Sequence, residues 1–205
     1  MENFGRNVFL NCPFDDDYRQ LLLSAIFTIK HLGYIPRLSL ERANSAETRI
    51  DKIVGLIVES KFGIHDLSRM VSEAESEHYR MNMPFELGID YGCKRLKEGA
   101  WSTKQILILE KERYRYQKAL SDLSGSDIKN HDDEPLKIVK VIRDWFVATE
   151  ELHDAPSGNL IWARYNEFQA YLFDELVEKN GHQSVDDVQI AEINQYMNRW
   201  VKENI

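Results

Sequence analysis

The chain has 205 residues, of which 43% are hydrophobic and 29% are charged, and its formal net charge is −8. This composition is ordinary for a folded globular protein and argues against wholesale disorder. The negative charge argues against a protein that binds nucleic acid by neutralising phosphates. No apolar stretch approaches the roughly 18 residues of a membrane span, and no signal peptide precedes the first expected strand. We therefore expect a cytoplasmic protein that binds neither nucleic acid nor membranes.

Short apolar runs alternate with amphipathic segments over the first half of the chain. The apolar runs predict strands at 7–14, 34–41, 62–66 and 105–111. The amphipathic segments predict helices at 15–33, 45–61 and 82–96, the last with Asn82 as a candidate cap. This alternation predicts a parallel sheet covered by helices on both faces. We expect the first strand at the centre of the sheet, and Pro36 places the second strand nearer an edge.

The second half of the chain reads as helical. Helices are expected at 114–125, 135–152, 159–181 and 184–205, the last one capped by Ser184. The predicted fold is an open, mainly parallel, doubly wound α/β sheet of four to five strands, flavodoxin-like, with additional C-terminal helices. We divide it into a core, 1–125, and a helical extension packed on that core, 126–205.

Aromatic residues recur along the last two predicted helices. They predict either core packing or an oligomer interface, and they are Trp162, Tyr165, Phe168, Tyr171, Phe173, Tyr196 and Trp200. The two cysteines, Cys12 and Cys93, lie in apolar patterns and are expected to be buried free thiols.

Two carboxylates mark one edge of the predicted sheet. Asp66 ends the third strand, and Glu86 lies in the first turn of the next helix. In open α/β sheets this edge binds ligands, and the end of the first strand lies beside it. A carboxylate in a first helical turn is stabilised as an anion, so we expect Glu86 to act ionised, as a nucleophile or a charge stabiliser. The simpler alternative is an exposed first-turn Glu86 and a strand-end cap at Asp66.

Other chemical motifs are missing from the sequence. There is no GxxxxGK[ST], GxGxxG, GxSxG, HExxH or CxxC pattern. We therefore expect no metal and no bound cofactor. His65 points to the opposite face of its strand from Asp66, which favours a hydrogen-bonded core histidine over a catalytic partner.

Three motifs together resemble one group of bacterial proteins. VFLNCPF at 8–14, GIHDLS at 63–68 and NMPFELG at 82–88 are similar to motifs of nucleoside deoxyribosyltransferases and of TIR (Toll/interleukin-1 receptor-like) domains. Deoxyribosyltransferases carry a similar strand-end aspartate, then a small-residue turn followed by FELGYA. Here Met83 and Pro84 replace that turn. The resemblance covers about residues 7–131 and implies a TIR-like sheet.

The resemblance implies roles for particular residues. Glu86 would be the catalytic glutamate that attacks or stabilises the anomeric carbon of a ribose, and Asp66 would hold sugar hydroxyls or the base. The other residues expected at the substrate are Asn11, Pro13 and Phe14 from the first strand and Asn82 and Met83 at the helix start. The segment ALSDLSGSDIKNH also resembles one in small TIR-like proteins, which would bring Asp122 or His131 to the same edge.

The loop at 69–81 joins the third strand to the helix that carries Glu86. It is polar and lacks glycine, and loops of this length beside a binding site are often lids. We expect Arg69 or Arg80 to meet an anionic group such as a phosphate.

Three hypotheses about function follow. In the first, the chain cleaves a base–ribose bond, with NAD as the favoured substrate, not a cofactor, and a nucleoside or nucleotide second. TIR-like relatives that act on NAD often serve in antiphage defence. In the second, the chain senses a nucleotide-derived signal without turnover. The third is an assembly module, in which the helical surfaces form a homo-oligomer.

Overall fold

The computed structural model describes residues 3–41, 44, 46–69, 81–114, 120–123 and 125–205. Five strands form one open, parallel sheet in the order β2-β1-β3-β4-β5. They are β1 (Asn7–Asn11), β2 (Ile35–Arg37), β3 (Phe62–Asp66), β4 (Gln105–Glu110) and β5 (Lys129–Asn130). The predicted doubly wound α/β fold is confirmed, and Pro36 lies in an edge strand as expected.

The centre of the sheet differs from the prediction. We expected β1 there, but β3 is the central strand because β4 and β5 add on its far side while only β2 adds beside β1. The sheet has five strands, within the predicted four to five, but the position of the fifth was not predicted. Its two residues, Lys129 and Asn130, are polar and half-buried to exposed, so they form no apolar run that a sequence pattern would detect.

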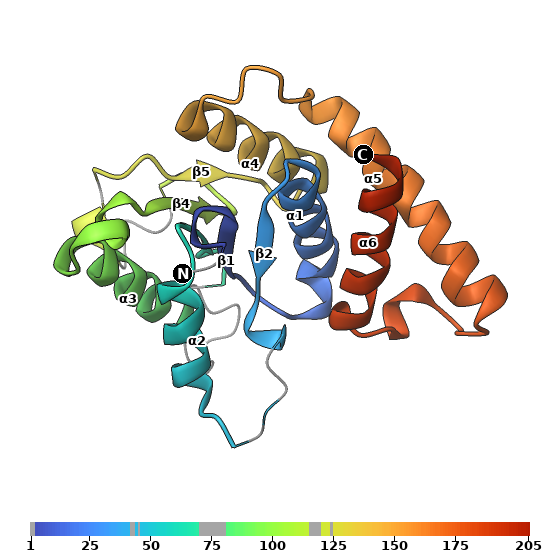
Figure 1. The fold of residues 1–205 in the computed structure, drawn as a ribbon, viewed down its shortest axis with the longest axis horizontal. Coiled ribbons are helices and arrows are strands. Elements are labelled where there is room, and N and C mark those ends of the chain that lie inside the picture. Colours follow the sequence, from blue (N-terminus) through green and yellow to red (C-terminus); the bar gives the residue numbers. More distant parts are fainter. Residues whose placement is uncertain (1–2, 42–43, 45, 70–80, 115–119, 124) are drawn as a thin grey trace.

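The described residues form six α-helices, which are arranged around the sheet and on one another (Figure 1). They are α1 (Arg19–His31), α2 (Arg49–Val58), α3 (Asn82–Leu96), α4 (Pro135–Glu150), α5 (Gly158–Phe173) and α6 (Ile190–Asn204). Helices α1 and α4 cover one face of the sheet, and α2 and α3 cover the other. Helix α5 continues into a π-helical turn, Asp174–Lys179, and α5 and α6 pack outside α1.

Several element ends differ from the sequence-based boundaries. The first strand ends at Asn11, because the chain turns at Pro13 into a short 3-10 helix, η2 (Asp16–Tyr18), that precedes α1. Asn82 is the first residue of α3 and not its cap; Met81 occupies the cap position without a side-chain hydrogen bond. Ser184 caps a separate 3-10 turn, Val185–Asp187, ahead of α6.

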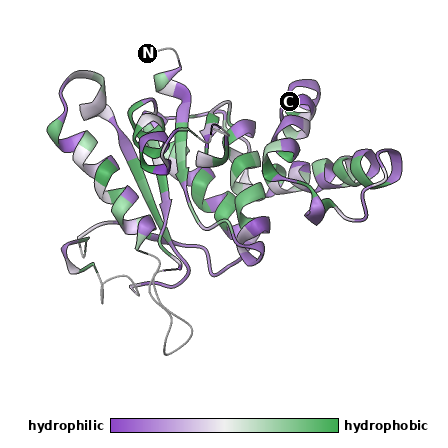
Figure 2. Ribbon diagram, turned by 90° about the horizontal axis from the view of Figure 1, so that it is seen from below, coloured by the Kyte–Doolittle hydropathy of each residue, from purple (hydrophilic) through white to green (hydrophobic). Residues whose placement is uncertain are grey.

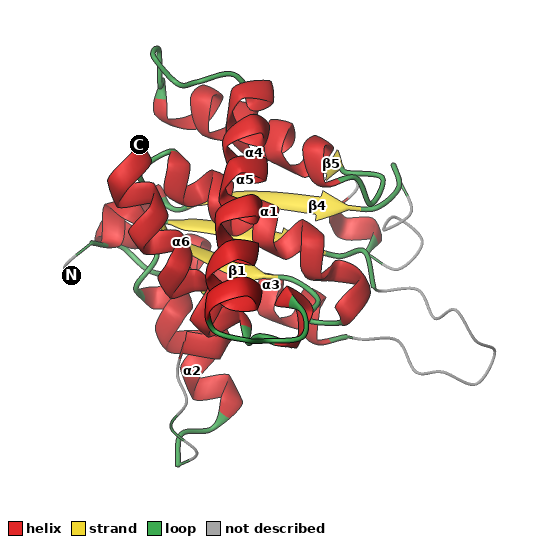
Figure 3. Ribbon diagram, turned by 90° about the vertical axis from the view of Figure 1, so that its right-hand side faces the viewer, coloured by secondary structure: helices red, strands yellow, loops and turns green. Residues whose placement is uncertain are grey.

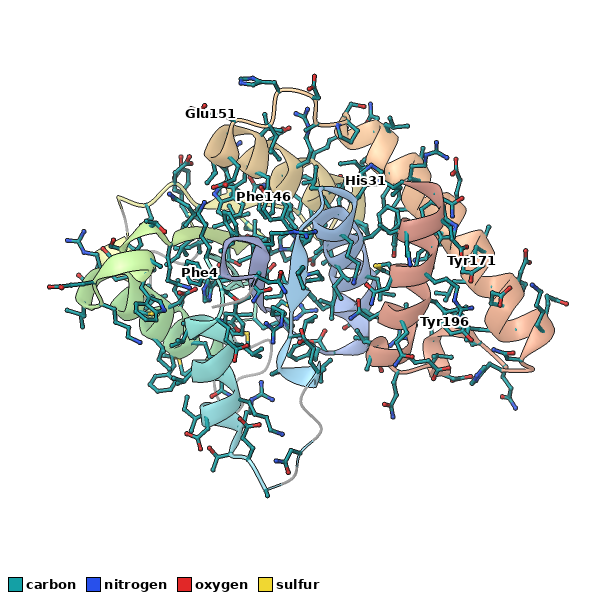
Figure 4. The ribbon with its side chains drawn as sticks, viewed as in Figure 1. Phe4, His31, Phe146, Glu151, Tyr171 and Tyr196 are labelled. Carbon is teal, nitrogen blue, oxygen red and sulfur yellow. The ribbon has the colours of Figure 1, made fainter. Side chains whose placement is uncertain are left out.

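The main hydrophobic core lies between the sheet and the helices α1, α4, α5 and α6. Along β1, Val8 and Leu10 face this core while Phe9 faces α2 and α3, as the alternation of a strand requires. Apolar residues follow the strands and the inner sides of the helices (Figure 2). Phe146 of α4, labelled in Figure 4, stacks on Tyr34 with ring centroids 4.3 Å apart.

The aromatic residues of α5 and α6 mostly serve the core. Tyr165, Phe168 and Trp200 are buried in it, which confirms core packing for these three. Phe173 is 47% exposed. Tyr171 and Tyr196 lie on the outer helices at the right of Figure 4 and are half-buried. In the described part of the chain, no helix combines the length and apolarity that a membrane crossing needs.

A buried polar chain lies under α3. Lys104 is fully buried, donates to the carbonyl oxygens of Ile57 and Ser60, and lies 3.1 Å from the Asp90 carboxylate. The other carboxylate oxygen of Asp90 lies 2.9 Å from His65 Nε2. Burial opposes ionisation of Asp90, but His65 and Lys104 outweigh it and lower the pKa of this carboxyl. His65 is thus the hydrogen-bonded core histidine that the sequence predicts.

Gly63 leaves the space that this polar chain fills. A Cβ at Gly63 would lie 2.1 Å from Asp90 Oδ2 and 2.9 Å from His65 Nε2. We expect Gly63→Ala to lower the free energy of unfolding by about 2–4 kcal/mol, because it overpacks the site and separates buried charged partners. Urea unfolding of the variant measures the loss.

Gly88 in α3 provides the matched control, because a Cβ there meets nothing within 4 Å. Gly88→Ala should be neutral or stabilising by up to about 1 kcal/mol through helix propensity. Equal stability of the two alanine variants would contradict the proposed requirement for glycine at position 63.

Candidate functional site

A cavity of about 680 Å³ opens at the carboxyl ends of β1 and β3. Residues that follow β1, residues that follow β3 and the starts of α2 and α3 line it. They are Cys12, Pro13, Phe14, Asp15, Arg49, Arg69, Met81, Asn82 and Met83. The strand order 2-1-3-4-5 reverses direction between β1 and β3, and ligands of such sheets bind at this point. The β4 arrow in Figure 3 points toward this edge of the sheet.

Glu86 lies one helical turn beyond Asn82 and Met83, on the same side of α3. Its side chain is only 6% exposed, and its Oε1 lies 3.9 Å from the Arg49 guanidinium at the start of α2. Burial raises the pKa of Glu86 to about 7, and the charge of Arg49 partly opposes that rise. The prediction placed Glu86 in the first turn of its helix, but α3 begins at Asn82 and Glu86 lies beyond that turn. Burial therefore raises the pKa of this carboxyl, where a first-turn position would have lowered it.

Asp66 is buried away from the cavity and fully engaged with protein donors. The Tyr18 hydroxyl lies 2.5 Å from Oδ2, His131 Nε2 lies 2.9 Å from the same oxygen, and the Ser68 amide donates to Oδ1 at 2.8 Å. Burial opposes ionisation, but the bonds from His131, Ser68 and Tyr18 outweigh it and lower the pKa of Asp66. These contacts bring together the end of β3, the start of α1 and the segment after β5.

The neighbours Ser68, His131 and Asp66 do not form a nucleophilic triad. The Asp133 amide donates to His131 Nδ1 at 3.0 Å, so the ring proton lies on Nε2. Nε2 then faces both the Ser68 hydroxyl, at 2.9 Å, and Asp66. A triad needs a histidine nitrogen that accepts the serine proton while the other donates to the carboxylate. This histidine lacks that arrangement, and we assign the cluster a structural role.

Asn11 connects β1 to the start of α3. Its amide nitrogen lies 3.0 Å from His65 Nδ1 and donates to the Met83 carbonyl at 2.9 Å. Both partners are acceptors, so His65 carries its proton on Nε2, toward Asp90. The buried polar chain that begins at Lys104 thus ends at the Met83 carbonyl in the first turn of α3, one turn before Glu86.

The structure separates the predicted site residues into two groups. Pro13, Phe14, Arg69, Asn82 and Met83 line the cavity, and their contact with a substrate stays a prediction. Asn11, Asp66 and His131 are each at most 2% exposed and are not among the lining residues.

Two further predictions have different outcomes. Asp122, which the resemblance placed near this edge together with His131, lines a separate groove of about 520 Å³ between α3 and β4. Arg80 and most of the predicted lid, 70–80, lie outside the described residues.

Sequence reasoning missed Arg49, Asp15, Cys12 and Met81 as lining residues. The position of Arg49 could have been predicted from the order of helices and strands. A helix that precedes a parallel strand begins at the carboxyl edge of the sheet, so the first residue of α2 had to lie near the cavity. Burial, with the charges of Asp66 and Glu86, raises the pKa of the Cys12 thiol well above its usual range, so Cys12 is a poor nucleophile at neutral pH.

In the described residues, no group of three or more His, Cys, Asp or Glu side chains has the arrangement of a metal site. Comparison of the chain with family models, with curated proteins and with solved structures finds no match. What the cavity does therefore has to be argued from its own residues.

Tyr18→Phe tests the role of Asp66 in stability. The change removes one hydrogen bond to a buried carboxylate, and we expect it to lower the free energy of unfolding by about 1.5–3 kcal/mol at neutral pH. Because the folded pKa of Asp66 is depressed, this loss should be largest above about pH 4 and should shrink as the pH falls and Asp66 becomes protonated.

Tyr34→Phe is the control for Tyr18→Phe, because no hydrogen bond of the Tyr34 hydroxyl is found among the described residues. Denaturant unfolding at several pH values compares the two. Equal losses in both variants at every pH would show that the Tyr18 hydroxyl does not stabilise the Asp66 carboxylate.

Glu86 gives the stability a second pH dependence of opposite sign. The folded pKa of about 7 lies above the ordinary value of 4.5. Between these values the folded chain keeps a proton that the unfolded chain has lost, so stability should fall as the pH rises from about 4.5 to about 7. Glu86→Gln removes this component. The free energy of unfolding of the variant should therefore rise relative to that of the wild type as the pH rises from about 4.5 to about 7. Parallel pH profiles of the two proteins would contradict the assignment.

Proposed function

We propose that the chain is an N-glycosidase that cleaves the base–ribose bond of a nucleotide in the cavity at the β1–β3 edge. The observation that carries the proposal is a buried carboxyl, Glu86, in contact with a cationic residue, Arg49, that lines the cavity. Cleavage of an N-glycosidic bond passes through a cationic sugar, and it is assisted by a carboxyl group that stabilises that cation or donates a proton to the leaving base.

The lining suits the two ends of a nucleotide. Arg49 and Arg69 supply guanidinium groups that bind phosphate well. Phe14, Pro13 and Met83 offer apolar and aromatic surface for a base. The volume of about 680 Å³ lies within the range of small-molecule sites, about 300–1,000 Å³.

The charge of Glu86 bears on the choice of substrate. An ionised Glu86 would stabilise the ribosyl cation and take the proton of the attacking water, which is sufficient for NAD because nicotinamide leaves as a neutral molecule. A protonated Glu86 would instead donate to a purine or pyrimidine as it leaves. With a pKa of about 7, both forms are populated near neutral pH, and both NAD and ordinary nucleotides are candidate substrates.

A second candidate function is nucleotide binding without turnover. One observation favours it: Glu86 is 4% exposed and is not among the residues that line the cavity, so catalysis requires Arg49 or α3 to move. The two functions differ in whether the bound ligand leaves intact. Antiphage defence is a role that either function would suit.

Product chromatography after incubation with NAD or AMP tests the proposal. We expect free base and the ribose product from the wild type, and a fall of about 10²-fold or more with Glu86→Gln, the scale of losing one preorganised electrostatic group. Glu203→Gln, the same change at an exposed residue of α6, should keep full activity. Recovery of both NAD and AMP uncleaved would support the binding-only function. Unchanged turnover in Glu86→Gln would remove Glu86 from the mechanism.

A further inference from the structure

The two arginines of the cavity are held differently. The guanidinium of Arg69 lies 3.3 Å from the carboxylate of Asp15, which lines the same cavity. Arg49 is 57% exposed at its side chain, and its one ion-pair contact within the described residues is the 3.9 Å approach to Glu86. That distance is beyond hydrogen-bond range. The donors of Arg49 are therefore available to a ligand in a way that those of Arg69 are not.

Glu86 depends on Arg49 for compensation of its charge. Within the described residues the Glu86 carboxyl has no hydrogen bond, and Arg49 is its one ion-pair partner. Other titratable groups near this point are Cys12 and Asp15 after β1, His65 and Asp66 at the end of β3, Asp90 on α3 and Arg69. Of these, the carboxylates are repulsive to a second anion, His65 is hydrogen-bonded to Asp90 and Asn11, and Arg69 is paired with Asp15.

We propose that Arg49 binds the phosphate group of the nucleotide, and that the Glu86 carboxyl takes up a proton when it does so. The identity of the ligand as a nucleotide rests on the proposed function. Two effects act in the same direction: Glu86 loses its one cationic neighbour, and a phosphate brings negative charge close to it. Because a buried carboxylate without a partner is unfavourable, the proton is taken up from solvent.

Proton uptake narrows the class of substrate. A protonated Glu86 suits a nucleotide whose base is neutral and must gain a proton as it leaves. The electron pair of the C1′–N bond goes to the base nitrogen, and the Glu86 proton goes to the base. Water then adds to C1′ and gives its proton back to the Glu86 carboxylate. A pyridinium base such as that of NAD needs no such proton, so the inference selects ordinary nucleoside phosphates over NAD.

Calorimetric titration with a ligand that cannot be cleaved tests the inference separately from turnover. Formycin 5′-monophosphate and formycin carry an adenine-like base joined to ribose by a carbon–carbon bond, so they serve as the phosphorylated and unphosphorylated probes. Titration in two buffers of different ionisation enthalpy, at about pH 7.5, measures the protons exchanged on binding.

The wild type should bind the monophosphate more tightly than the nucleoside and take up a fraction of a proton. Arg49→Gln should weaken monophosphate binding by about 10- to 100-fold, the value of a hydrogen bond to a charged group, leave formycin binding unchanged and abolish proton uptake. Glu86→Gln should keep the phosphate preference without the uptake. Arg164→Gln, on an exposed part of α5, is the matched control and should behave as the wild type.

Several outcomes would overturn the inference: no binding of the monophosphate by the wild type, binding without proton uptake, or loss of phosphate preference in Arg69→Gln but not in Arg49→Gln. Chromatography with AMP separates the two proposals. Linked proton uptake without cleavage would remove the N-glycosidase function alone. Cleavage without the linkage would remove this inference alone.

Discussion

The rest of the structure depends on one buried anion, the carboxylate of Asp66. A charge without water needs several donors at once, and here they come from segments far apart in the sequence: Tyr18 before α1, Ser68 after β3 and His131 after β5. Meeting that requirement fixes the start of α1 and the start of α4 against the end of β3. The same requirement makes Asp66 unsuitable as a substrate ligand, because its oxygens are already engaged.

His65, the residue before Asp66 on β3, fixes the helices on the other face of the sheet. His65 points to the α2–α3 side, where Asp90 holds one ring nitrogen and Asn11 the other. Lys104 lies against the second oxygen of Asp90. Two adjacent residues of the central strand therefore fix both layers of helices. Asn11 extends this control to the Met83 carbonyl, so the turn of α3 that carries Glu86 is positioned by groups that never reach the cavity.

The sequence predicted what depends on local pattern. Alternation and helical spacing identified four of the five strands, and Pro13, Phe14, Asn82 and Met83 were placed at the correct edge because the carboxyl ends of parallel strands meet there. The features that the sequence did not predict depend on tertiary packing. The two polar residues of β5 join the sheet only because β4 is there to pair with them.

The charge state of Glu86 could not be read from sequence for the same reason. The sequence pattern suggested a first-turn carboxylate, which the helix dipole would favour as an anion. In the structure Glu86 lies beyond the first turn of α3 and is buried, which favours the acid. The topology could have placed Arg49 near the cavity, but its approach to Glu86 depends on how α2 packs beside α3. The resemblance to deoxyribosyltransferases and TIR domains stays a prediction, and the chemistry proposed for the cavity rests on its own residues.

The two edge strands bear on how copies of the chain can associate. β2 has three residues, with Pro36 in the middle and no amide proton there, and β5 has two. Such edges present too few backbone donors and acceptors to template a strand from a neighbouring molecule, which is how sheet proteins avoid polymerising edge to edge. The short edges therefore guard against edge-to-edge growth of the sheet into fibrils.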